Sequence, residues 1–147
     1  MSYTREDLLD LIDWEHSYDY KLDSREEILK EIFLSMRTRE LTNIEYVFIA
    51  KSFCNKIFML GHIIYDARYD KNDNYSNIAN ERFNTFINMA NKAVKLEDDF
   101  ISEYYELEVS DPGSGEDLTD FKKLAKDTVN IYKDIRDWMI EKGYNIE

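Results

Sequence analysis

The longest apolar pattern in the chain runs from Asn43 to Arg68 and predicts its central helix. With successive residues placed about 100° apart, the polar side chains fall in one arc and apolar side chains occupy every other direction. An apolar surface this wide is typical of a helix enclosed by others. The polar arc contains Glu45, Lys51, Ser52, Asn55, Lys56, His62 and Asp66. The side chains expected in the core are Tyr46, Val47, Ile49, Phe53, Ile57, Phe58, Leu60 and Ile64.

Four further segments repeat apolar residues at helical spacing and are expected as helices: 5–14, 25–39, 77–108 and 117–142. Capping boxes, in which an acidic residue follows Ser or Thr by three positions, mark three helix starts. These pairs are Thr4 with Asp7, Ser24 with Glu27, and Thr42 with Glu45. Residues 15–23 show no period, so we expect a loop there.

Glycine and proline are scarce, with four and one residues respectively, and this scarcity removes most of the turn chemistry that a sheet protein needs. Residues 109–116 contain the proline and two of the glycines, which predicts a flexible loop. The expected fold is therefore all-α. It is a single domain over residues 1–147, a bundle of about five helices around the central apolar helix 43–68.

Cysteine usage and the chain start bear on localisation. The single cysteine, Cys54, cannot form an internal disulfide, and we expect it to be a buried, unreactive thiol in a reducing cytoplasm. The start, MSYTREDLL, lacks the basic region and apolar run of a secretion signal. The apolar pattern of the central helix is interrupted by the polar residues Lys51, Asn55 and His62, so we expect this helix not to span a membrane. The predicted location is cytoplasmic.

The net charge of -12 argues against direct binding to nucleic acid, because phosphates would be repelled. Most of this charge lies between Lys95 and Lys122, a stretch with ten acidic residues and no Lys or Arg. Such a run is either solvated or complementary to a basic surface. Aromatic residues within it favour an interface. The candidate partner-binding residues are Glu97, Asp98, Asp99, Glu103, Tyr104, Tyr105, Glu106, Glu108 and Asp111.

These patterns predict a small acidic binding protein that inhibits or sequesters a larger protein by covering a basic surface. A nuclease or another nucleic-acid-binding protein is the expected kind of partner. Immunity proteins, phage anti-defence proteins and DNA mimics work in this way, and the analogy rests on charge and size alone. We expect no cofactor and no catalytic or metal-binding residue.

Two alternatives remain open. Glu27 and Glu31, with His62 and Asp66, place ligands one helical turn apart, as a metal-dependent all-α hydrolase would require. The second alternative is a calcium-binding module at 70–81, where Asp70, Asn72, Asn74 and Glu81 match loop ligand positions. Against calcium, Tyr75 stands where the sharp turn requires glycine, and the chain offers no second loop of this kind.

Overall fold

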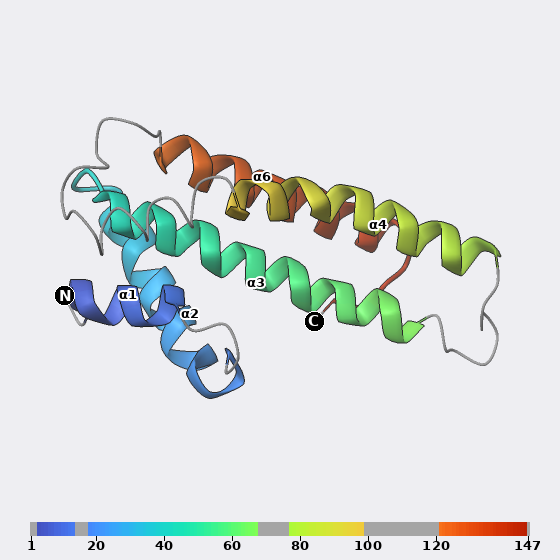
Figure 1. The fold of residues 1–147 in the computed structure, drawn as a ribbon, viewed down its shortest axis with the longest axis horizontal. Coiled ribbons are helices and arrows are strands. Elements are labelled where there is room, and N and C mark those ends of the chain that lie inside the picture. Colours follow the sequence, from blue (N-terminus) through green and yellow to red (C-terminus); the bar gives the residue numbers. More distant parts are fainter. Residues whose placement is uncertain (1–2, 14–17, 68–76, 99–120, 147) are drawn as a thin grey trace.

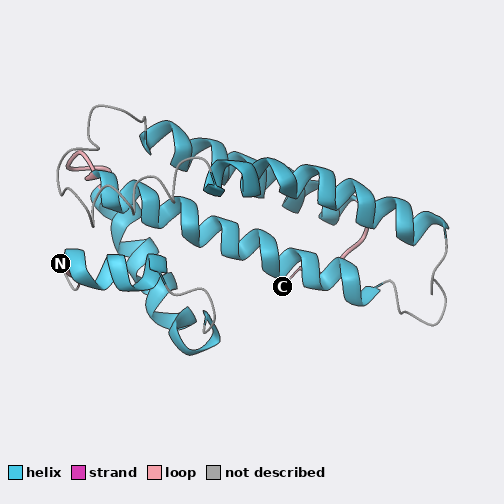
Figure 2. Cartoon of the chain, viewed as in Figure 1, coloured by secondary structure: helices cyan, strands magenta, loops and turns pink. Residues whose placement is uncertain are grey.

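The computed structural model describes residues 3–13, 18–67, 77–98 and 121–146. These residues form five helices and no strand, so the predicted all-α class is confirmed for this part of the chain (Figure 2). The helices are α1 (Arg5–Asp13), α2 (Tyr18–Ser35), α3 (Asn43–Ala67), α4 (Asn77–Leu96) and α6 (Phe121–Glu141).

The three long helices α3, α4 and α6 lie side by side along the long axis, and α1 and α2 pack at one end (Figure 1). Helices α3 and α6 run in the same direction, and α4 runs opposite to both. Helix α3 contacts each of the other four helices. It is therefore the element that joins the two ends of the molecule.

Two apolar clusters form the core. The first contains side chains from α1, α2 and the first half of α3, closed by Phe121, Leu124 and Ala125 of α6. The second joins the second half of α3 to α4 and to the last turns of α6, where Ile135 and Met139 have no exposed surface. Among the described residues, α3 and α6 contribute buried side chains to both clusters, and α4 contacts the first through the partly buried Leu96.

The two halves of α3 are covered very differently. Residues 44–52 are buried on every side, and they include Glu45, Lys51 and Ser52, which the sequence places in a polar, outward arc. That prediction was wrong for these three residues, because α1, α2 and α6 surround this half. Phe58 was expected in the core but is 68% exposed. Among the described residues, the buried side of the second half of α3 packs on α4 and α6.

Of the described helices, α3 alone is long and apolar enough to cross a membrane. Its polar residues therefore do not by themselves rule out a span, contrary to the expectation from sequence. Packing gives another reason for its apolar character, since half of that stretch is buried against the rest of the chain.

Of the predicted helix starts, the one at Thr4 is confirmed and the one at Ser24 is wrong. The capping box of α1 forms as expected, with the Thr4 N–H donating to Asp7 Oδ2 at 2.9 Å and the Asp7 N–H to Thr4 Oγ1 at 3.2 Å. The predicted start at Ser24 was wrong, because α2 begins at Tyr18 and Ser24 lies inside it. Residues 18–23 contain no Gly or Pro to stop a helix, and their mixture of aromatic and charged side chains hides the helical period.

Helix α6 ends in a glycine cap. Gly143 adopts a left-handed conformation with φ of 89°, which glycine reaches without a Cβ penalty. Its N–H donates to Ile140 O and the Tyr144 N–H to Met139 O, both at 3.0 Å. This pair of hydrogen bonds is the Schellman motif. It turns the chain so that Tyr144 packs on the second cluster.

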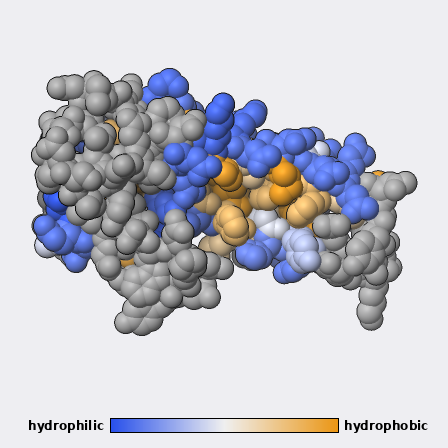
Figure 3. Space-filling view, in the orientation of Figure 1, coloured by the Kyte–Doolittle hydropathy of each residue, from blue (hydrophilic) through white to orange (hydrophobic). Residues whose placement is uncertain are grey.

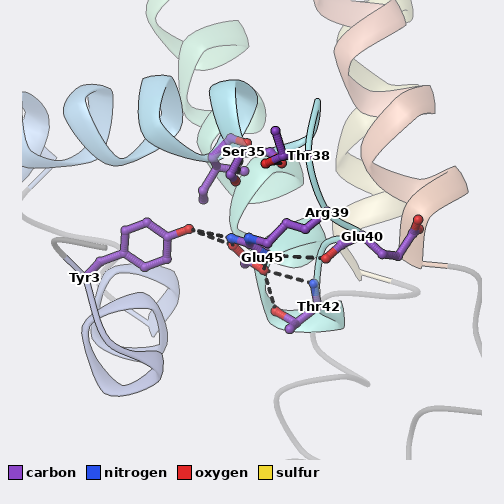
Figure 4. A network of polar contacts seen from close by, with 8 residues as sticks. Tyr3, Ser35, Thr38, Arg39, Glu40, Thr42 and Glu45 are labelled. Atoms are coloured by element: carbon purple, nitrogen blue, oxygen red, sulfur yellow. Dashed lines mark hydrogen bonds and ion pairs between the residues drawn. The ribbon is translucent and has the colours of Figure 1, made fainter.

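A buried carboxylate holds three segments together at the start of α3 (Figure 4). Glu45, 3% exposed, accepts hydrogen bonds from the Tyr3 hydroxyl at 2.6 Å and from Arg39 at 2.6 and 2.9 Å. It also accepts bonds from the N–H and hydroxyl of Thr42, both at 2.9 Å. Burial by itself would raise the pKa of Glu45, but these donors outweigh it and lower that pKa to about 2.

This network predicts a stability loss in acid. An unfolded glutamate titrates near its ordinary pKa of 4.5, so the stabilisation is complete above about pH 5 and is lost as the pH falls towards about 2. A shift of this size corresponds to about 3 kcal/mol at neutral pH. Urea unfolding at a series of pH values should show this loss, and Glu45→Gln should flatten it. The exposed-carboxylate control Glu81→Gln should keep the wild-type pH profile; a pH profile unchanged by Glu45→Gln would contradict the network's role.

Neighbouring residues on α3 give a second test. Ile57 is 4% exposed and Phe58 68% exposed. Ile57→Ala should lower the free energy of unfolding by about 2–4 kcal/mol because it leaves a cavity, whereas Phe58→Ala should change it by no more than about 0.5 kcal/mol. Chemical denaturation of both variants measures the difference, and equal effects would refute the described orientation of α3.

Candidate functional site

An open apolar groove of about 510 Å³ runs between α3 and α4. Helix α3 lines it with Cys54, Ile57, Phe58, Gly61, His62 and Tyr65. Helix α4 lines it with Phe83, Phe86, Ile87, Ala90, Asn91, Ala93 and Val94, and Glu97 and Asp98 line it directly after the end of α4. The orange atoms that gather on the facing side of the long helices in Figure 3 mark this region between hydrophilic surroundings.

Small residues set the depth of the groove. A Cβ added at Gly61 would lie 2.9 Å from two ring carbons of Phe86, so this glycine lets α4 approach α3 closely. Ala90 and Ala93 are buried on the facing side of α4. The two helices therefore meet along a low floor, above which longer side chains stand as walls.

The walls of the groove are large apolar side chains in contact with solvent. Phe58 is 68% exposed, Val94 46%, Tyr65 44% and Ile87 38%. Single exposed apolar residues are common on protein surfaces, but a contiguous set along a hollow marks a binding surface. The groove thus has the apolar composition of an interface centre.

The groove is acidic at one end and aromatic at the other. Glu97 and Asp98 border the first end, and Tyr65 meets Phe83 edge to face at the second, with ring centroids 6.1 Å apart. None of the described residues that line it is Lys or Arg. Its charged lining is therefore entirely negative.

Glu97 forms an ion pair with Lys51 of α3, whose side chain is only 8% exposed. The pair ties the end of α4 to the buried half of α3. Asp98, by contrast, is exposed. Of the two acidic residues at this end, Asp98 is the one whose charge faces solvent.

The thiol of Cys54 lies on the floor beside this end and is 8% exposed. Burial raises its pKa to about 12, and the nearby Glu97 carboxylate adds to the increase. The thiolate is the reactive form, so its burial and raised pKa predict a slowly reacting cysteine. The expectation of a buried, unreactive thiol agrees with these observations.

Of the candidate interface residues, the structure describes only Glu97 and Asp98. The other seven, Asp99, Glu103, Tyr104, Tyr105, Glu106, Glu108 and Asp111, lie outside the described residues. The acidic run of the sequence nevertheless begins at the residues that border the groove.

The described residues do not bring the candidate ligands of either alternative site together. Glu27 and Glu31 lie on α2, and His62 and Asp66 on α3. Within the described part of the chain, no three His, Cys, Asp or Glu side chains gather closely enough to hold a metal ion. The calcium-loop residues Asp70, Asn72 and Asn74 lie outside the described residues, and Glu81 is an exposed residue of α4.

The sequence interpretation missed the groove. Phe58 was expected in the core but lines the groove, as do the exposed apolar residues Ile87 and Val94 of α4. A helix whose apolar residues exceed the surface that its neighbours can cover is the signal that was available.

Comparison with protein-family models, curated proteins and solved structures found no match to this chain.

The environment of Cys54 predicts slow alkylation in the folded protein. With a pKa of about 12, the thiol at about pH 8 holds roughly a thousandfold less thiolate than an unfolded cysteine. Iodoacetamide should therefore react at least about a hundredfold more slowly in buffer than in concentrated urea. Mass spectrometry of timed samples gives both rates, and similar rates would contradict the burial of this thiol.

Proposed function

We propose that this protein is a small acidic binding protein that inhibits or sequesters a larger protein by covering a basic surface on it. The observation that carries the proposal is the apolar groove between α3 and α4, bordered by Glu97 and Asp98, where the acidic run begins. An apolar centre beside charged residues is the usual composition of a protein interface.

The two features make different contributions to binding. Apolar side chains that become buried slow dissociation, and they are provided by the exposed walls of the groove. A strongly negative field speeds encounters with a positive partner, and the net charge of -12 provides it. Together they favour a basic protein as the partner over a neutral or acidic one.

A nuclease or another nucleic-acid-binding protein is the proposed kind of partner. Surfaces that bind phosphate backbones are rich in Lys and Arg, so an acidic protein is complementary to them. Covering such a surface would block access of the nucleic acid, which makes inhibition the expected consequence. Immunity, anti-defence and DNA-mimic proteins provide the functional analogy, and a cytoplasmic location would suit it.

The charge contribution is tested with the partner captured from the source cell on immobilised protein. Replacing Asp98, Asp99, Glu103 and Glu106 by their amides should lower the association rate about tenfold or more at low salt. The matched control neutralises Glu6, Asp134, Asp137 and Glu141, which are exposed on α1 and α6. It changes net charge equally and should have the smaller effect, as measured by surface plasmon resonance.

Salt and the aromatic residues complete this test. Association should slow as salt rises from about 0.05 to 0.5 M, because the Debye length falls from roughly 14 to 4 Å. Tyr104→Ala with Tyr105→Ala should mainly speed dissociation. An acidic partner, or one that binds the amide variant as fast as the wild type, would refute the proposed function.

A further inference from the structure

We infer that the groove between α3 and α4 receives a basic amphipathic α-helix of the partner. The inference rests on the proposed function and names the structural element that this function would use. Three observations carry it: the shape of the groove, the side chains along its walls and the position of its charge.

The opposite side of the same helix pair already holds a helix. Helix α6 lies behind α4 in Figure 1, and its Ile135 and Met139 are completely buried against α3 and α4. The apolar groove faces the viewer in the same orientation, and no residue of α6 lines it. Two packed helices form two such grooves, and within the described residues one of them is filled by a helix while the other is open.

The open groove has the length of a short helix. From Cys54 to Tyr65 its wall on α3 rises about 17 Å, which corresponds to about three helical turns. Helices bind such grooves through apolar residues at i, i+3, i+4 and i+7. Phe58, Ile87 and Val94 would lie beside these anchors, since they are exposed along both walls.

The charge of the groove selects a basic helix. Its charged lining consists of Glu97 and Asp98 at one end, and Asp98 is exposed. A helix with Lys or Arg at that end would complement Asp98, whereas an acidic helix would be repelled. A second copy of this chain is disfavoured for the same reason, because each copy carries a net charge of -12.

The inference is tested with a synthetic peptide of about 14 residues that carries Leu at i, i+3, i+4 and i+7 and Lys at the remaining positions. One control peptide has the same composition with the Leu positions shuffled, and the other carries Glu in place of Lys. Isothermal titration calorimetry gives each Kd. The amphipathic basic peptide should bind about tenfold or more tightly than either control.

Two protein variants locate the binding site. Phe58→Asp introduces a charge on the groove wall, and Leu34→Asp introduces the same charge on α2, outside the groove lining, at a similar exposed fraction of 63%. Phe58→Asp should weaken the peptide about tenfold or more, and Leu34→Asp by no more than about twofold. Circular dichroism melts establish that both variants fold.

Four results would overturn the inference. The first is equal binding of the shuffled peptide, which would mean attraction by charge alone. The second is an equal effect of the two Asp variants, and the third is salt-independent binding of the peptide. The fourth is a dimer in light scattering that Phe58→Asp converts to a monomer, since the occupant would then be a second copy.

The captured partner separates the two proposals. If it binds wild-type protein and Phe58→Asp equally but loses affinity for the amide variant, the groove inference fails and the proposed function stands. If the amide variant also binds the partner with unchanged affinity, both the groove inference and the proposed function fail. Loss of binding with Phe58→Asp but not with Leu34→Asp supports the inference.

Discussion

The structure depends on how unevenly one apolar helix is covered. Helix α3 presents apolar side chains in nearly every direction, and such a helix must be enclosed if it is not to leave apolar surface in water. Helices α1, α2 and α6 enclose its first half. In the second apolar cluster of the described residues its second half packs on α4 and α6, and no described helix covers the side that lines the groove.

Local signals in the sequence were sufficient to predict that the described helices exist, but not where α2 begins or what surrounds each helix. The pattern gave α3 to within one residue, and the Thr4 capping box forms as expected. The burial of Glu45 and Lys51 could not be predicted from the periodic pattern. Their partners Tyr3 and Glu97 are 42 and 46 residues away, and periodicity along one helix carries no information about contacts at such separation.

The candidate site shows the same limit. Ile57 and Phe58 are adjacent and both apolar, yet one lies in the core and the other on a groove wall. Their difference reflects which side of α3 has a neighbour, which is a property of topology. The acidic run, in contrast, is a composition signal and needs no fold to be recognised. What the structure adds is that its first two residues border an apolar groove.

The first two acidic residues of this run, Glu97 and Asp98, have different roles: Glu97 stabilises the packing and Asp98 presents a charge to solvent. Glu97, directly after the end of α4, is paired with the buried Lys51, so its carboxylate ties the end of α4 to α3. Asp98 is exposed at the same end of the groove. The ion pair thereby sets where the outward-facing negative charge begins relative to the apolar walls. This fixed offset between charge and apolar surface would select a basic helix of one direction over its reverse.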